Sequence, residues 1–271
     1  MASRRDLLKA ACFGAATGAV GKFGFDAYTD RLVVERKTLS LPRWTASGLK
    51  VALLADMHAN RPRAVQRARR ALDLAAEERP DCVVLAGDFI DFTRSAIEDD
   101  AAMILEPIRN LGVPVLAIMG NHDYWSMVPE RVVAALKGAG AQLLRNEVVE
   151  VGGVAFAGVD DAIEKRHNLD FFGAGRFDKN LVVLMHEPDI ADEMPRHISL
   201  QLSGHSHGGQ VCLEKGKPIF PPPLGEKYVA GFYQEGEAPV PLYVTRGVGT
   251  TGFDIRFRCP PEVSILTLTS A

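Results

Sequence analysis

Two histidines separated by one residue, His205 and His207, follow an apolar segment with strand-like alternation. In an extended chain, residues i and i+2 point to the same side, so both imidazoles can face one site at the end of a strand. Gly204 and Gly208 flank the pair and leave room for backbone to approach a ligand. Imidazole nitrogen is a frequent ligand of divalent transition metals. Alone, a His-x-His pair is a weak signal, and its weight depends on the other histidines and carboxylates.

Polar residues with metal-binding chemistry end four more apolar segments. They are Asp56 and His58 after the first, Asp88 after the second, Asn121, His122 and Asp123 after the third, and His186 after the fourth. Five of the seven histidines therefore lie at predicted strand ends, which random placement would rarely produce. The other two, His167 and His197, lie in polar surroundings and are interpreted as surface residues.

Three strand–helix units are expected to position the first of these residues. Near-continuous apolar runs predict buried strands at 49–55, 82–86 and 113–118, an entry strand is predicted at 31–41, and helices are predicted at 62–79, 96–111 and 127–138. Alternating strands and helices are typical of a parallel sheet, in which ligands bind beyond the carboxyl ends of the strands. The polar residues after these strands are therefore expected to converge.

The second half of the chain reads as short strands separated by turn signals. These strands are predicted at 142–151, 154–159, 181–185, 200–202, 210–213, 228–233, 242–245 and 263–269, with a short helix within 161–172. We expect a second, more antiparallel sheet packed against the first. One compact domain over residues 31–271 would hold both sheets.

Taken together, five motif blocks resemble those of the calcineurin-like metallophosphoesterases. The blocks are Asp56-x-His58, Gly87-Asp88, Gly120-Asn121-His122-Asp123, His186 and Gly204-His205-Ser206-His207, in the order of that superfamily. The resemblance spans residues 50–210. The leader, the ending Gly208-Gly209-Gln210 and the tail at 243–250 and 260–263 extend it to the exported YkuE/YaeI-like subgroup. It implies an α/β fold, a four-layer α/β/β/α sandwich with two mixed sheets.

The resemblance also implies a centre of two divalent metal ions. Asp56, His58 and His207 would hold the first ion, Asn121, His186 and His205 the second, and Asp88 would bridge them. A carboxylate has two oxygens and can span two cations roughly 3.5–4 Å apart. Mixed oxygen and nitrogen ligands suit Mn, Fe or Zn, and Mn is favoured for activity.

The implied reaction is hydrolysis of phosphate esters, phosphodiesters above all. A metal-bridging hydroxide would attack phosphorus in line, and the metals would offset charge on the phosphoryl oxygens. His122 lies outside the ligand set and would stabilise or protonate the leaving oxygen. Asp123 would orient His122 by accepting a hydrogen bond from its other ring nitrogen. A merely structural hydrogen bond is the alternative role for His122.

Two other functions stay open. One is hydrolysis of a lipid-linked pyrophosphate, as in the UDP-diacylglucosamine pyrophosphatases of lipid A metabolism, although an export leader counts against simple transfer. The other is a non-catalytic metal-binding protein of the cell envelope, against which His122 and Asp123 argue because storing metal requires no acid. The net charge of -3 and the lack of a basic, aromatic stripe disfavour nucleic acid as a partner.

Residues 1–30 differ in character from the rest. Ser3-Arg4-Arg5-Asp6-Leu7 resembles a twin-arginine (Tat) signal, and the apolar run that follows at 10–25 is too short and too weakly apolar for a membrane span. We expect the Tat export machinery to carry the protein to the periplasm or the outer face of the cytoplasmic membrane. Peripheral membrane association and a monomeric state are expected there. An amphipathic surface helix is the alternative, and cleavage of the leader stays open.

Several residues near the motifs allow two interpretations. Asn60 and Asp91 could hydrogen-bond to ligands or lie in solvated turns, Tyr124 and Trp125 could line a substrate cleft or pack in the core, and Asp160 and Asp161 could face the cleft or cap a helix. The proline-rich loop 220–224 could lie at the rim and contact a lipid or acyl chain, or form a rigid surface loop. Cys82 reads as a buried thiol, and a Cys212–Cys259 disulfide stays open.

Overall fold

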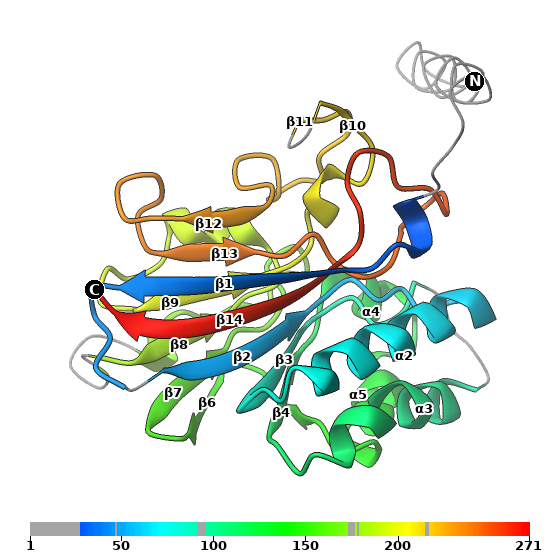
Figure 1. The fold of residues 1–271 in the computed structure, drawn as a ribbon, viewed down its shortest axis with the longest axis horizontal. Coiled ribbons are helices and arrows are strands. Elements are labelled where there is room, and N and C mark those ends of the chain that lie inside the picture. Colours follow the sequence, from blue (N-terminus) through cyan, green and yellow to red (C-terminus); the bar gives the residue numbers. More distant parts are fainter. Residues whose placement is uncertain (1–27, 47, 92–95, 173–176, 178, 215–216) are drawn as a thin grey trace.

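Two facing β-sheets with three long helices on one side form the protein (Figure 1). The computed structural model describes residues 28–46, 48–91, 96–172, 177, 179–214 and 217–271. The twin-arginine-like segment lies almost entirely outside the described residues, so the leader and the domain boundary stay predictions. Among the described residues, no helix is both long and apolar enough to cross a membrane.

The first sheet carries the predicted parallel strands. Its order is β1 (Val33–Leu41), β14 (Glu262–Ser270), β2 (Leu49–Leu54), β3 (Cys82–Ala86), β4 (Val115–Ile118) and β5 (Gln142–Leu143). The strands β2 to β5 run parallel to one another. The connecting helices α2 (Pro62–Glu77), α3 (Ile97–Arg109) and α5 (Pro129–Gly138) cover one face of this sheet, as predicted (Figure 1).

The second sheet is mixed. Its order is β12 (Gly231–Tyr233), β13 (Leu242–Val244), β9 (Leu200–Ser203), β8 (Leu181–Leu184), β7 (Val154–Gly158) and β6 (Glu147–Val151). The four central strands run parallel, and only the edge pairs β12–β13 and β6–β7 are antiparallel. The expected antiparallel character is thus confined to the edges. The parallel centre matters because it sends β8 and β9 toward the same end of the sheet.

Three segments predicted for the second sheet lie elsewhere. The C-terminal strand β14 inserts into the first sheet, parallel to β1 and antiparallel to β2. The segment 142–151 splits, so that β5 joins the first sheet and β6 the second. β10 (Cys212–Glu214) pairs with β11 (Lys217–Pro218) in a separate ribbon. Strand periodicity gives no partner, which is why these long-range pairings were not predicted.

Alternating side chains build three apolar layers. Ala52 and Leu54 of β2 face the helices, whereas Val51 and Leu53 face the second sheet. Both faces of the central strands are buried, which explains their near-continuous apolar sequence. The outer face of the second sheet packs on loops and on two 3-10 turns, η2 (Asp170–Phe172) and η3 (Pro188–Asp192), so the helix expected within 161–172 is only η2.

Candidate metal centre

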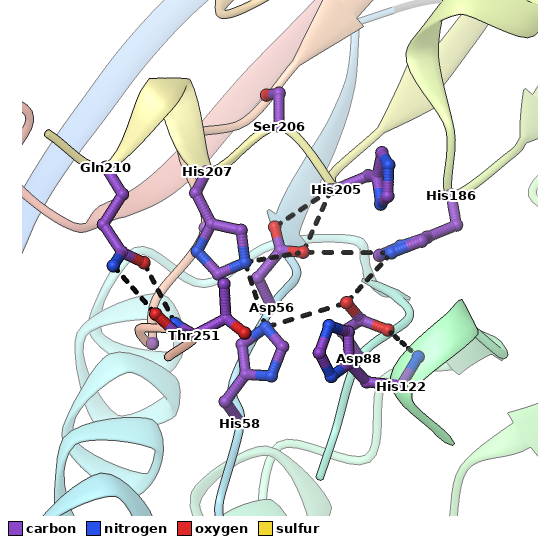
Figure 2. A network of polar contacts seen from close by, with 12 residues as sticks. Asp56, His58, Asp88, His122, His186, His205, Ser206, His207, Gln210 and Thr251 are labelled. Carbon is purple, nitrogen blue, oxygen red and sulfur yellow. Dashed lines mark hydrogen bonds and ion pairs between the residues drawn. The ribbon is translucent and has the colours of Figure 1, made fainter. Parts of the chain in front are cut away.

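All seven predicted ligands lie at the carboxyl ends of parallel strands and gather in one place. Asp56 and His58 follow β2, Asp88 follows β3, Asn121 follows β4, His186 follows β8, and His205 and His207 follow β9 (Figure 2). None of the seven is more than 5% exposed. The convergence therefore follows from the direction of the strands in both sheets.

The donor atoms separate into two groups that share one carboxylate. Asp56, His58, Asp88 and His207 form one group, and Asp88, His186 and His205 form the other; within each group the donor atoms lie within 4.8 Å of one another. Asp88 Oδ2 is 3.6 Å from His58 Nε2 and 3.2 Å from His186 Nε2. Asp56, His58 and His207 of the first predicted set thus lie together, as do His186 and His205 of the second, and Asp88 belongs to both groups.

Five of these residues have left-handed backbone conformations. Their φ angles are 53° at Asp56, 44° at His58, 56° at Asp88, 68° at His205 and 52° at His207. Residues other than glycine rarely adopt such angles, and they persist only where the surrounding structure holds them. The loops are therefore held in unfavourable conformations that turn these side chains toward one point.

Hydrogen bonds at the outer ring nitrogens orient three of the histidines. Nδ1 of His186 donates to the carbonyl oxygen of Ala86 at 2.7 Å, and Nε2 of His205 donates to that of Pro223 at 2.8 Å. Nδ1 of His58 hydrogen-bonds to Asp91 Oδ1. Each bond fixes the tautomer and leaves the other nitrogen with its lone pair available to a metal.

Glycines make room for the carboxylates. A Cβ at Gly120 would lie 2.8 Å from His186 Nε2 and closer still to Asp88 Oδ1. At Gly204 and Gly247 it would lie 2.9 and 2.5 Å from Asp56 Oδ2. Any larger residue at these positions would displace the carboxylates. The glycines of the motifs are therefore needed for close approach of backbone to the centre.

The atoms left unpaired fit a pair of cations. The side-chain oxygen of Asn121 is buried without a hydrogen-bond partner, although such oxygens are nearly always paired. Nε2 of His58 and Nε2 of His207 face each other at 2.9 Å. Although burial favours a neutral carboxyl, His186, when protonated in the metal-free protein, holds the pKa of Asp88 well below its ordinary value. This donor set suits two divalent metal ions, which would accept the free oxygen and nitrogen lone pairs.

His122 lies beside the centre without belonging to either ligand group. Its backbone N–H donates to Asp88 Oδ1 at 2.9 Å, and its side chain is 22% exposed. Its Nδ1 lies 3.0 Å from Asp91 Oδ1. Asp91 also accepts from His58 and from Asn60 Nδ2, the latter at 2.6 Å. Asn60 and Asp91 thus hydrogen-bond within the site, the first of the two interpretations considered for them.

Asp123 has a different position from the one expected. Its carboxylate accepts four backbone N–H groups, from Asp88 at 2.9 Å, Phe89 at 2.8 Å, Ile90 at 3.2 Å and Gly120 at 3.0 Å. It therefore holds the loops after β3 and β4 together, and the orienting contact to His122 comes from Asp91 instead. Asp123 lies in α4 (Asn121–Trp125), a five-residue helix in which neighbouring side chains point in different directions.

Two residues to which the sequence assigned no role, Arg256 and Gln210, hydrogen-bond to the loops around the centre. Arg256 is fully buried and donates to the carbonyl oxygens of His207 at 3.1 Å, Gly249 at 2.9 Å and Arg246 at 2.7 Å. Gln210 accepts from Thr251 N at 2.9 Å and donates to Thr251 O at 3.0 Å (Figure 2). The position of Gln210 at the end of the His-rich motif could have indicated a role in the site. Arg256 lies outside every motif, so nothing in the sequence indicated its role.

A cavity of about 780 Å³ opens over the centre. It is lined by Asp88, Asn121, His122, His205 and His207 and by apolar residues, among them Trp125, Phe220 and Pro222. The proline-rich loop thus lies at the rim. Tyr124, by contrast, is buried and donates to Asp160 at 2.5 Å, so both lie away from the cleft wall. Asp161 is buried beside Glu187, and Cys82, Cys212 and Cys259 are buried and form no disulfide among the described residues.

Comparison with known proteins agrees with this geometry. The family model of the calcineurin-like phosphoesterases matches residues 49–209. An uncharacterized metallophosphoesterase of Bacillus subtilis, YkuE, is 31% identical over 99% of this chain and 98% of its own length. The phosphodiesterase YaeI of Escherichia coli is 29% identical over 99% of this chain and 100% of its own.

Similarity to solved structures is weaker. The crystal structure of a dimetal phosphatase from Danio rerio has a TM-score of 0.46 at 14% identity, and the match covers 74% of this chain and 88% of the other. The assignment to a family rests on the sequence matches, whose model spans all five motif blocks. The chain is a member of the calcineurin-like phosphoesterases, a family of phosphoric ester hydrolases.

Proposed function

We propose that the protein is a dinuclear-metal-dependent phosphodiesterase. The observation that carries the proposal is the buried carboxylate of Asp88, shared by two ligand groups and open to a cleft beside His122. When bound, two divalent ions would activate water and offset charge on the phosphoryl oxygens. The resemblance of this chain to a relative whose name is phosphodiesterase YaeI supports the preference for diesters.

Residues of the chain itself would handle the leaving group. His122 lines the cleft, lies outside both ligand groups, and is exposed enough to reach a substrate oxygen. As an imidazolium it would donate a proton to the departing oxygen. Asp91 would stabilise that charged form and orient the ring, because it accepts at Nδ1 and leaves Nε2 facing the cleft.

The metals proposed are Mn, Fe or Zn, with Mn favoured for activity. The donor set of imidazole nitrogens, carboxylates and one amide oxygen suits all three. For the cellular context, the twin-arginine-like segment at residues 1–30 supports export to the periplasm or the outer face of the cytoplasmic membrane. A monomer that associates peripherally with the membrane is the state proposed there.

Metal analysis followed by a substrate panel tests the function. The protein is expected to bind two divalent ions and, with Mn²⁺, to hydrolyse bis-p-nitrophenyl phosphate faster than p-nitrophenyl phosphate. Asp88→Asn should abolish turnover and lower the metal content, whereas Asp99→Asn, on the exposed side of α3, should change neither. Two bound metals without turnover of any ester would favour the non-catalytic envelope protein instead.

A further inference from the structure

Large apolar side chains are exposed mainly around the mouth of the cleft. Seven such side chains are exposed in the part of the chain that the structure describes, and three line the cleft: Trp125 at 48%, Phe220 at 46% and Phe253 at 59%. Two more, Met127 and Leu213, lie within two residues of lining residues. Exposed apolar side chains that gather at one opening indicate a binding surface, whereas single exposed apolar residues are common on any protein surface.

The cleft is also poor in cations. No Lys or Arg occurs among the described residues that line it. A substrate with several phosphates, or a nucleic acid, would therefore find no side-chain charge beyond the metal centre to bind its remaining anionic groups. The walls favour a substrate with a single anionic group at the centre and an apolar remainder.

Trp125 is fixed on the side of the cleft next to His122. The two rings lie 4.9 Å apart between centroids, and both residues belong to α4. The indole Nε1 donates to Glu164 Oε1 at 2.8 Å, which holds the ring in place. The exposed face of the Trp125 ring is therefore available to a substrate group that extends from the centre past His122.

Phe220 lies on the loop that contacts His205. The carbonyl of Pro223 accepts from His205 Nε2, and a Cβ at Gly225 would lie 3.2 Å from His205 Cδ2. The loop therefore packs directly on a predicted ligand. Prolines at 221–223 restrict its backbone, so Phe220 projects from a rigid support.

Phe253 is held in place by Gln210. The Gln210 amide donates to the carbonyls of Thr251 at 3.0 Å and Phe253 at 3.2 Å, and accepts from Thr251 N (Figure 2). These bonds attach the 251–253 turn to the end of the His-rich motif. Trp125 thus packs beside His122, Phe220 lies on the loop that contacts His205, and Phe253 is held by Gln210. These three aromatic residues form an apolar wall that is in place before substrate binds.

From these contacts we infer that the substrate is a phosphodiester with one extended apolar substituent, held by Trp125, Phe220 and Phe253. The inference rests on the proposed phosphodiesterase function and names its substrate class. The phosphate would lie beside Asp88, and the apolar substituent would extend along the aromatic residues. Gln210 lines the cleft too, and we assign it a positioning role because its amide holds the turn that carries Phe253.

A chain-length series tests this directly. The full Mn²⁺-loaded protein is assayed with p-nitrophenyl alkyl phosphodiesters from methyl to octyl, below their micellar concentrations. We expect kcat/KM to rise by about 3-fold per methylene over the first carbons, because each methylene is withdrawn from water. Most of this rise should come from a lower KM with little change in kcat, because the apolar group contributes equally to binding of the ground state and the transition state.

Single substitutions test whether these residues bind the apolar group of the substrate. Phe253→Ser and Phe220→Ser should each lower the octyl-to-methyl ratio of kcat/KM at least 5-fold. Gln210→Ala should do so too, by releasing the 251–253 turn, while Gln210→Glu keeps one acceptor and should lose less. The matched control is Met103→Ser, an equally exposed apolar residue on α3 that should leave the ratio and the activity unchanged.

The outcomes separate the two proposals. If no diester is hydrolysed, the proposed function fails. If the methyl diester is hydrolysed and the ratio stays near one, the proposed function stands and the apolar wall is refuted. A fall of the ratio in Met103→Ser equal to that in Phe253→Ser would refute it as well. Parallel assays with monomeric dihexanoyl phosphatidylcholine and with phosphatidylcholine vesicles then distinguish a soluble amphiphile from a membrane lipid, both of which agree with the inference.

Discussion

Nδ1 of His122 and Oδ1 of Asp91 lie 3.0 Å apart, and the same carboxylate oxygen accepts from Nδ1 of His58. One side chain therefore orients both a predicted ligand and the predicted acid. Although burial opposes ionisation, the hydrogen bonds from His122 and His58 lower the pKa of Asp91 below its ordinary value. Asp91 is thus a stable anion between two imidazoles, and it accepts a hydrogen bond from each.

Replacing this anion should weaken catalysis in a recognisable way. We expect Asp91→Asn to lower kcat by about 10–100-fold, because the ring of His122 loses its orienting charge. Asn60→Ala, which removes only the third partner of Asp91, is the control and should keep most of the activity. An unchanged kcat in Asp91→Asn would contradict the role.

Gly120 offers a steric test of the centre. Its φ angle of −116° is open to any residue, so an alanine there brings no backbone strain. The added Cβ would nevertheless press on Asp88 and lie 2.8 Å from His186 Nε2. We expect Gly120→Ala to lower metal affinity at least ~10-fold, measured by metal content after dialysis against a weak chelator. Gly138→Ala, with no atom within 4 Å of its new Cβ, should retain full metal content; equal retention by Gly120→Ala would disprove the steric argument.

Local sequence was sufficient to locate the site because each predicted ligand ends a strand. Apolar runs such as 82–86 reveal their burial on both faces, and Asp88 directly follows that run. Strands that run parallel bring their ends together, so the residues after the first three buried strands could be placed at one edge. The family resemblance added His186, His205 and His207, because the second sheet was expected to be more antiparallel. The short helix α4 was missed because a five-residue helix has no readable periodicity.

The contacts behind the centre could not be predicted in the same way. Arg256 and His207 are 49 residues apart, and no periodic pattern links them. The place of β14 beside β2 likewise depends on pairing across the whole chain. Asp123 was assigned to His122 because they are neighbours in sequence, whereas the helix turns them apart.

Arg256 does not line the cleft, but we expect it to contribute strongly to the stability of the fold. Replacing it by Met removes the donor to the carbonyls of Arg246 and Gly249, whereas the carbonyl of His207 still accepts from the backbone N–H of Gln210. We expect Arg256→Met to lower the free energy of unfolding by about 2 kcal/mol or more, at about 1–3 kcal/mol for each of the two carbonyls that lose their donor. Urea unfolding of the metal-loaded protein measures this. Arg258→Met, at an exposed position two residues away, should cost little; equal losses in both variants would rule out the proposed support.

A buried carboxyl pair predicts how stability depends on pH. Asp161 and Glu187 are both fully buried; burial first, and then the charge of Glu187, raise the pKa of Asp161 to about 9. The folded protein therefore keeps a proton that the unfolded chain releases above pH ~4. The contribution of Asp161 to stability is full below that pH and falls as pH rises toward 9.

Asp161→Asn should abolish this dependence, because the amide is neutral at every pH and can still donate to Glu187. Urea unfolding between pH 5 and pH 8.5 should show the wild type losing more stability than Asp161→Asn, so that the two curves diverge as pH rises. Asp99→Asn, at an exposed carboxyl, should follow the wild type. Curves of wild type and Asp161→Asn that stay parallel would mean that Asp161 is ionised in the folded protein, and that the loop at 161–164 is held by the carboxylate itself.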